Sequence, residues 1–173
     1  MAVLLSRHNA ARTLLVLLLL LSCVGCDQVT KELARTYLAF QPPLSCCHDV
    51  VRLHYAENAG AFLGLGWNLP EETRILVFQF AVGIGLLALF VVLLQSQNQP
   101  HGFLIAWTLI LSGGIGNVLD RLLHHGRVTD FMNLGVGSLR TGIFNVADVF
   151  ITVGVLWLLL ALRQQDPPRE VAK

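Results

Sequence analysis

Four long apolar runs limit what this chain can fold into. The runs, free of Asp, Glu, Lys and Arg except for one acid in the last, are Thr13–Cys26, Ile75–Pro100, Gly102–Leu119 and Thr141–Leu162. A helix that crosses a membrane needs about 20 mostly apolar residues. The second and third runs meet that length alone. The first and fourth meet it only if each helix accepts one acid, Asp27 in the first and Asp148 in the last.

The composition also indicates a membrane protein. Of the 173 residues, 54% are hydrophobic and 13% are charged, whereas about a quarter of the residues in a soluble domain are charged. The net charge of +1 and the lack of a basic patch with interleaved aromatic residues argue against a nucleic-acid partner. We expect an all-α membrane protein, a single integral domain over residues 1–173, with transmembrane helices at roughly 13–39, 72–95, 102–123 and 144–163.

The first apolar run has a second interpretation, a secretory signal peptide. Two arginines precede it, and Val24-Gly25-Cys26 at its end resembles a lipoprotein cleavage site. Such sites usually carry Leu where this chain has Cys23, and the three further runs indicate a polytopic protein. The helix can continue through Asp27, because Lys31 lies four residues further on and shares its face. We therefore expect an uncleaved first helix.

Two polar loops, at roughly 40–71 and 124–143, separate the helices. Val50–Tyr55 in the first loop is β-branched and aromatic with partial alternation, which predicts a strand. Asn58–Gly66 is rich in turn formers. A small β-rich unit is therefore expected between the first two helices. With four helices both loops lie on one side of the membrane, although the distribution of Lys and Arg does not decide which side.

Two acids, Asp130 and Asp148, lie in apolar sequence near that face. A charged side chain near hydrocarbon costs about 3 kcal/mol or more, and intramembrane acids are functional by default. Two carboxyl groups at short range resist joint ionisation, and a pair that shares one proton is the working unit of an aspartic protease. Asp130 belongs to the second loop or its edge and Asp148 begins the fourth helix, so the topology allows them to meet.

Further polar residues collect at the same face. Asn117 lies three residues before Asp120 and four before Arg121, so a helix places all three on one side. Asn145 lies three residues before Asp148 and shares its face. Arg121 is too close in sequence to pair with Asp120, but it can reach a backbone carbonyl. Each of these side chains also has a structural interpretation, as a helix-packing or helix-ending group.

The cysteines and histidines give no metal site. Cys23 and Cys26 have CxxC spacing but lack a second pair or nearby histidine ligands, so they are interpreted as apolar filler. Cys46 and Cys47 are neighbours in a loop, where a disulfide between them would be strained, and no structural role follows. The histidines at 124 and 125 have no accompanying ligand set.

Five motifs in order resemble those of the lipoprotein signal peptidases, the signal peptidase II family. They are Asp27-Gln28-Val29-Thr30-Lys31, Asn58-Ala59-Gly60-Ala61-Phe62, Gly116-Asn117-Val118-Leu119-Asp120-Arg121, Val128-Thr129-Asp130-Phe131 and Phe144-Asn145-Val146-Ala147-Asp148. The second motif lacks one alanine of the family pattern. The resemblance covers most of the chain, and five ordered motifs are far more specific than one.

The resemblance implies a multi-pass protein of the bacterial inner membrane with cytoplasmic termini and an active site in a β-rich extracytoplasmic cradle. It implies an aspartic endopeptidase that removes the signal peptide from prolipoproteins, cutting just before a diacylglyceryl-modified cysteine. Asp130 and Asp148 would be the catalytic pair. Substrate-binding residues would be Asn58, Gly60, Asn117, Arg121 and Asn145, and supporting residues would be Asp27, Lys31 and Asp120. No metal or organic cofactor is implied. The expected partners are lipidated signal peptides and membrane lipid, with the enzyme a monomer.

Two alternatives stay open at this point. The first is an ion- or proton-coupled transporter with Asp27, Asp120 and Asp148 as a relay. It would typically need more helices, an oligomer or internal repeats, and the sequence has no such repeats. The second is a lipoprotein whose signal ends before Cys26, which N-terminal analysis of the mature chain would reveal. Both leave the ordered motifs unexplained.

Overall fold

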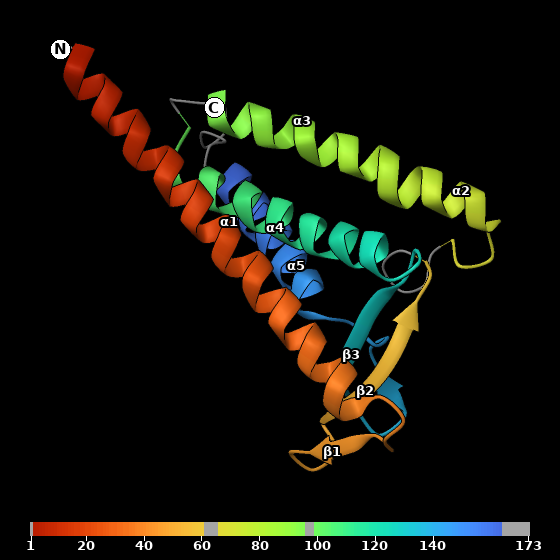
Figure 1. Cartoon of the computed structure of the whole chain (residues 1–173). Coiled ribbons are helices and arrows are strands. Elements are labelled where there is room, and N and C mark those ends of the chain that lie inside the picture. The colour runs from red at the N-terminus through yellow and green to blue at the C-terminus, as the bar shows by residue number, and fades with distance from the viewer. Residues whose placement is uncertain (1, 61–65, 96–98, 164–173) are drawn as a thin grey trace, which may run out of the picture.

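The structure is a computed structural model that describes residues 2–60, 66–95 and 99–163. Within these ranges, four helices are long and apolar enough to cross a membrane, and a small antiparallel sheet lies at one end of them (Figure 1). The spans are Ala10–Leu38, Glu71–Gln95, His101–Leu123 and Val146–Arg163.

The first and second spans differ from the predicted ranges. Helix α1 runs from Ala2 to Leu38 and so begins well before residue 13, because the polar and charged residues that interrupt an apolar run need not interrupt a helix. The second span consists of α2 (Glu71–Ile75), a π-helical segment η2 (Leu76–Ala81) and α3 (Val82–Gln95). The apolar pattern gave no sign of the π-helical segment, a feature that often marks functional sites.

Helix α4 (His101–Leu123) is the central helix and packs against α1, α3 and α5 (Val146–Arg163). A buried hydroxyl group on α4 finds its hydrogen-bond partner within the same helix, because the Ser112 hydroxyl donates to the Thr108 carbonyl at 2.6 Å. A Cβ atom on Gly113 would collide with the Ala147 carbonyl of α5. Small residues at this contact therefore let the two backbones approach closely, as is common between membrane helices.

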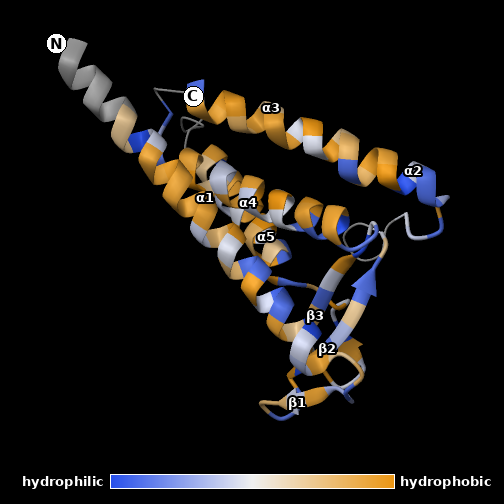
Figure 2. Ribbon diagram, viewed as in Figure 1, coloured by the Kyte–Doolittle hydropathy of each residue, from blue (hydrophilic) through white to orange (hydrophobic). Residues whose placement is uncertain are grey.

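The outer surface of the bundle is apolar. Figure 2 shows hydrophobic residues along α1, α3, α4 and α5, and more hydrophilic ones toward the sheet. Large apolar side chains that are more than half exposed include Leu18, Leu21, Ile84, Leu87, Leu156 and Leu160. Soluble monomers rarely expose apolar surface of this extent. Such a surface is suited to contact with the hydrocarbon core of a membrane.

The sheet has four antiparallel strands in the order β1-β2-β3-β4. Its members are β1 (Leu44–Cys46), β2 (Val51–Asn58), β3 (Val128–Val136) and β4 (Leu139–Arg140). The strands β1 and β2 lie between the first two helices, where a β-rich unit is predicted, but β3 and β4 come from the second loop, for which no strand is predicted. The reason lies in β3, where the four residues Val128–Phe131 are all buried, so the alternation that reveals a half-buried strand is missing.

The last turns of α1 hold the sheet against the bundle. Ala34, Leu38 and Phe131 form a buried apolar cluster, with partly buried side chains from β2, β3 and the start of α5 around it. Across the β2–β3 pair, Asn58 lies opposite Val128, and the register shifts between Leu53 and Ala56. This packing fixes the buried end of β3 beside the ends of α4 and α5 (Figure 1).

Candidate active site

Asp130 lies on the buried part of β3, opposite Ala56 of β2, and is 2% exposed. Two side-chain amides donate to its carboxyl group. Asn58 Nδ2 lies 3.0 Å from Oδ2, and Asn145 Nδ2 lies 2.7 Å from Oδ1. Both of these donors are uncharged. The group predicted to lie in a loop or at its edge is thus held in a strand.

Asp148 lies in the first turn of α5, where Asn145 precedes the helix and caps it. The Asp148 N–H donates to Asn145 Oδ1 at 3.0 Å, and the Asn145 N–H donates to Asp148 Oδ2 at 3.2 Å. This reciprocal pair has the form of a capping box, in which two otherwise unpaired backbone donors are satisfied. It explains why α5 begins at Val146 and not at residue 144 as predicted. Asn145 and Asp148 share a face, as predicted.

Asn145 and Asn117 join the two carboxyl groups into one network. Asn145 Nδ2 donates to Asp130 and also lies 3.1 Å from Asn117 Oδ1. Asn117 Nδ2 in turn donates to Asp148 Oδ1 at 2.9 Å. The Asn117 amide orientation is therefore fixed, because its oxygen faces donors and its nitrogen faces a carboxylate. We call Asp130 and Asp148 the dyad.

The pKa of Asp130 is raised from its usual value of 3.8 to about 6. Burial is the largest cause, since removal from water disfavours the charged form, and the negative charge of Asp148 is the second. The hydrogen bonds from Asn58 and Asn145 oppose the shift, and so does the more distant charge of Lys31. Asp130 therefore takes up a proton at a pH far above that of an ordinary aspartate.

Arg121, at the end of α4, contacts the backbone and not Asp120, as predicted. Its Nη2 donates to the Gly60 carbonyl at 2.7 Å and its Nη1 to the Asn117 carbonyl at 3.2 Å. The guanidinium carbon lies 5.4 Å from the centre of the Phe78 ring, which η2 supplies, within the range of a cation–π contact. Within the described residues, the buried Nε of Arg121 has no hydrogen-bond partner.

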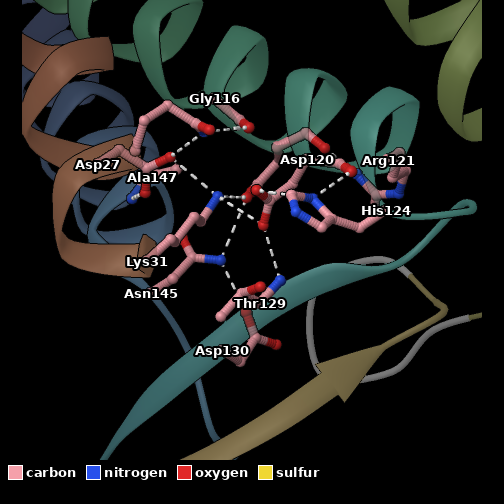
Figure 3. Close-up of polar contacts among 12 residues, drawn as sticks. Asp27, Lys31, Gly116, Asp120, Arg121, His124, Thr129, Asp130, Asn145 and Ala147 are labelled. Atoms are coloured by element: carbon pink, nitrogen blue, oxygen red, sulfur yellow. Dashed lines mark hydrogen bonds and ion pairs between the residues drawn. The ribbon is translucent and has the colours of Figure 1, made fainter. Parts of the chain in front are cut away.

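A second set of charged residues lies beside the dyad, and Figure 3 shows how it converges on Lys31. We call Asp27, Lys31 and Asp120 the supporting cluster; all three side chains are fully buried. Lys31 Nζ lies 2.8 Å from Asp27 Oδ2 and 3.5 Å from Asp120 Oδ2. It also donates to Asn117 Oδ1 at 2.9 Å. The predicted pairing of Asp27 with Lys31 is confirmed, and Lys31 connects the supporting cluster to the dyad through one amide.

Each supporting carboxylate accepts a backbone N–H from the residue just before a dyad aspartate. Asp27 Oδ1 accepts the Ala147 N–H at 2.8 Å, one residue before Asp148. Asp120 Oδ2 accepts the Thr129 N–H at 2.7 Å, one residue before Asp130. Successive side chains of a strand point to opposite faces. The side chains of Thr129 and Asp130 therefore point to opposite faces of β3 (Figure 3).

Two further residues complete the surroundings of Asp120. Arg35 Nη1 lies 3.4 Å from Asp120 Oδ1 and donates to Thr129 Oγ1 at 2.7 Å. His124 Nδ1 lies 3.1 Å from the Asp120 carbonyl oxygen. Two buried acids thus face one buried lysine and one partly buried arginine, a near balance of charge that lowers the cost of burial.

Two grooves meet at Asp148. One, with a volume of about 430 Å³, lies between η2, α4 and α5 and is lined mostly by apolar side chains, with Asn117 and Arg121 at its polar end. The other, about 590 Å³, lies between α5 and the end of the sheet and includes Asn58 and Arg140. Both grooves are lined mostly by apolar side chains, and Asp148 lines both of them, so its carboxyl group is open to a substrate that occupies both.

All ten predicted site residues fall in one connected network of hydrogen bonds and ion pairs. The sequence reasoning missed Arg35, Thr129, Ala147 and Phe78. Arg35 could have been found, because it follows Lys31 by four residues on the same helical face. Thr129 and Ala147 act through backbone N–H groups, which no side-chain pattern reveals.

The part of the chain that the structure describes contains no candidate metal site. No group of three or more His, Cys, Asp or Glu side chains there could hold a metal ion. The dyad is surrounded by amide donors, which suit carboxylates and not a cation. The arrangement is that of two carboxyl groups with different surroundings, linked by asparagine side chains.

The fold and the site together define an integral membrane protein with a two-carboxylate centre where its helices meet a small sheet. The chain belongs to the signal peptidase II family, because the family model described as signal peptidase (SPase) II matches residues 19–163.

Similar proteins and a similar solved structure agree with this family membership. The chain is 37% identical over 143 residues to the lipoprotein signal peptidase of Chlorobium phaeobacteroides (strain BS1), covering 78% of this chain and 86% of the relative. It is 36% identical over 135 residues to that of Sphingopyxis alaskensis, covering 77% and 76%. A bacterial membrane enzyme solved by the in meso method at 2.3 Å resolution superposes with a TM-score of 0.75 at 26% identity, covering 91% of this chain and 93% of that one.

Proposed function

We propose that this protein is an aspartic endopeptidase that removes the signal peptide from diacylglyceryl-modified prolipoproteins, cutting just before the lipidated cysteine. Membership of the signal peptidase II family supports the protease activity and the substrate class. The observation that carries the catalytic type is the dyad. Asp130 and Asp148 bind the same asparagine, Asn145, where two grooves meet.

The proposed chemistry uses one carboxylate and one carboxylic acid. The carboxylate accepts a proton from water while the water oxygen bonds to the scissile carbonyl carbon. The carboxylic acid protonates the carbonyl oxygen, and the C–N bond then breaks as the leaving nitrogen takes up a proton. The raised pKa of Asp130 supports it as the member that holds the proton. The titration belongs to the pair as a whole, since the two charges interact.

Arg121 and the asparagines are the proposed substrate contacts. The free Nε of Arg121 is a buried donor at the edge of the apolar groove, and a peptide carbonyl of the substrate would satisfy it. Asn58 and Asn117 already bind the dyad. They would hold the carboxyl groups in position while charge develops, which is the role of preorganised dipoles in hydrolytic sites.

The two grooves suit the two parts of such a substrate. The groove between η2, α4 and α5 is lined by Val82, Ile151 and Val155, among other apolar side chains, and would take the apolar segment of a signal peptide. The groove beside the sheet includes Asn58 and Arg140 and would take the peptide that follows the scissile bond. Asp148 lies between them.

The proposal also includes the location of the enzyme in the cell. It is a single integral domain over residues 1–173, a monomer of the bacterial inner membrane, with the β-rich cradle and the dyad at the extracytoplasmic face. A cysteine that carries acyl chains is held at the membrane surface. The dyad lies at the sheet end of the bundle, so the bond next to such a cysteine could reach it without leaving the membrane.

The test is cleavage of a synthetic lipidated precursor in detergent. Asp130→Asn and Asp148→Asn should each lower kcat about 10²- to 10⁴-fold or more, because each removes one partner of acid–base catalysis. The matched control is Glu32→Gln, which neutralises an acid that is 68% exposed and should cleave at the normal rate. Near-normal cleavage by either aspartate variant would refute the dyad.

The same assay tests the substrate class. A precursor of identical sequence without the diacylglyceryl group should be cut poorly, because it lacks the anchor that brings its bond to the depth of the dyad. Efficient cutting of the unlipidated precursor would contradict the proposed role of the lipid while leaving the aspartic mechanism intact.

A further inference from the structure

The turn between β1 and β2 carries two adjacent thiols, Cys46 and Cys47, that lie outside the dyad and the supporting cluster. Both cysteines are exposed and neither is in a disulfide. Cys46 ends β1, and successive side chains of a strand normally point to opposite faces. The chain leaves the strand at Cys47, where φ is +54°, so the two neighbouring thiols lie at the point where the strand becomes a turn.

The backbone of this turn is strained. Cys47, His48 and Asp49 have positive φ values in succession, of 54°, 55° and 66°. The left-handed conformation costs about 1–2 kcal/mol for each residue other than glycine. Strain of this kind persists only where the surroundings hold it, and it often marks functional segments.

Asp49 is the residue that holds the turn. Its carboxylate accepts hydrogen bonds from the Ser45 hydroxyl at 2.7 Å and from Arg52 at 2.5 and 2.7 Å. These contacts keep the pKa of Asp49 well below its usual range. The Asp49 carbonyl oxygen accepts a further hydrogen bond from Arg140 Nη1 at 2.8 Å. The contacts of one residue thus maintain the conformation of the turn next to the two cysteines.

We propose that Cys46 and Cys47 form a vicinal dithiol site that reacts with disulfide compounds and closes reversibly into a disulfide between the two neighbours. One thiolate attacks an external disulfide, forms a mixed disulfide with it and expels one external thiol. The second thiolate attacks the protein sulfur of the mixed disulfide and expels the other external thiol. The protein loses two hydrogens, and the external disulfide is reduced to two thiols.

The thiolate is the attacking species in both steps of the exchange. The ring that results is strained, because neighbouring Cα atoms lie about 3.8 Å apart and disulfides usually span about 4.4–6.8 Å. Strained disulfides are readily reduced, which makes the closure reversible.

The turn also contacts the groove beside the sheet, through Arg140. This side chain binds the Asp49 carbonyl and lines the same groove as Asp148. Ring closure changes the backbone torsions next to His48 and Asp49, so it moves the acceptor to which Arg140 is bound. This step rests on the proposed function, and it predicts weaker binding of the lipidated precursor after oxidation, with a higher KM and an unchanged kcat.

The site itself is tested without any substrate. The full-length protein in detergent is treated with oxidised glutathione, alkylated and analysed by mass spectrometry with peptide mapping. The wild-type protein should lose two hydrogens at Cys46–Cys47 and should regain alkylation of both residues after mild treatment with a thiol. Cys46→Ser and Cys47→Ser should each stop at a stable mixed disulfide on the cysteine that remains. Unmodified thiols, or stable mixed disulfides on both residues of the wild type, would overturn the proposal.

The cleavage assay tests whether oxidation of the two thiols affects the groove beside the sheet. The oxidised wild type should show a KM several-fold above that of the reduced enzyme, while the Cys46→Ser/Cys47→Ser variant should show no change on treatment. Identical KM values for the two redox forms would overturn the coupling. A protein that cleaves nothing in either form would refute the proposed function and leave the thiol result standing.

Discussion

The supporting cluster and the dyad each contain two acids, yet the two pairs are held differently. Asp27 and Asp120 face the ammonium group of Lys31 at 2.8 and 3.5 Å. Asp130 and Asp148 instead accept hydrogen bonds from the neutral amides of asparagines. The negative charges of the first pair are balanced by an ammonium group, whereas the hydrogen-bond donors to the second pair are uncharged. The first pair is suited to structure and the second to proton transfer.

The two pairs are nevertheless connected by the backbone. The supporting acids bind the N–H groups of Ala147 and Thr129, each one residue before a dyad acid. Lys31 reaches the dyad only through the Asn117 amide. The supporting cluster therefore positions the dyad side chains while keeping its positive charge one hydrogen-bonded amide away from them. The predictions below test this division of roles.

The largest expected effect comes from Lys31→Met. Loss of the ammonium group leaves Asp27 and Asp120 buried beside each other without their shared cation. Breaking a buried ion pair in this way costs about 3–5 kcal/mol. Thermal or denaturant unfolding in detergent should show a loss of this size, with cleavage reduced because the dyad loses its support.

Arg35→Met is the matched control for that variant. Arg35 lies one turn further along α1 and also faces Asp120, but it is 19% exposed and its ion pair spans 3.4 Å. The expected loss is about 1 kcal/mol or less. Equal losses for the two variants would show that Lys31 is not the centre of the supporting cluster.

The second effect is a pH dependence of catalysis. If Asp130 must be protonated, kcat/KM should fall as pH rises above about 6, by close to tenfold per pH unit well above that value. The sign follows from the raised pKa, since the catalytic proton is lost on the alkaline side. The cleavage rate is measured from pH 5 to pH 9 with a precursor that lacks groups titrating in this range. A rate that rises with pH would contradict Asp130 as the acid.

Gly116→Ala is the third test, because a Cβ at this position would lie 2.5 Å from Asp27 Oδ2. Overpacking of this kind costs about 1–3 kcal/mol. The displaced carboxylate should also weaken the contact with the Ala147 N–H. Gly25→Ala is the control, since nothing lies within 4 Å of a Cβ there. Unchanged stability of the Gly116 variant would mean that Asp27 is not tightly held.

Helical spacing predicted those parts of the site that lie within one helix. The pairing of Asp27 with Lys31, and the shared face of Asn145 and Asp148, follow from residues three or four apart, and the structure confirms both. The reach of Arg121 to a backbone carbonyl is also confirmed within the helix, at Asn117 four residues before it. These contacts depend on local geometry, which a sequence carries directly.

The parts that join separate elements could not be predicted in the same way. The first four residues of the strand that carries Asp130 are all buried and show no alternation, so the sequence pattern does not reveal this strand. Its register against β2 includes an irregularity after Leu53, and no turn-forming residue in the sequence indicates it. The amide links from Asn117 and Asn145 depend on how α4, α5 and β3 pack. Tertiary packing thus determined the half of the site that lies between elements.

The smallest effect concerns the stability of Asp130→Asn, and it distinguishes a catalytic acid from a structural one. The folded state raises the pKa of Asp130 from 3.8 to about 6, so this group favours folding most at low pH. Its contribution is lost as pH rises through about 6, and the ionised form then costs about 3 kcal/mol. Asparagine cannot ionise, but its NH₂ group faces one amide donor, which costs about 1 kcal/mol.

The most direct test of the division between the dyad and the supporting cluster is therefore the unfolding free energy of Asp130→Asn at pH 8 and at pH 4, measured beside its cleavage rate. We predict a variant that is about 1–2 kcal/mol more stable than the wild type at pH 8, loses this advantage at pH 4 and does not cleave. A variant that is less stable than the wild type at pH 8, or that still cleaves the lipidated precursor, would contradict the assignment of Asp130 to catalysis.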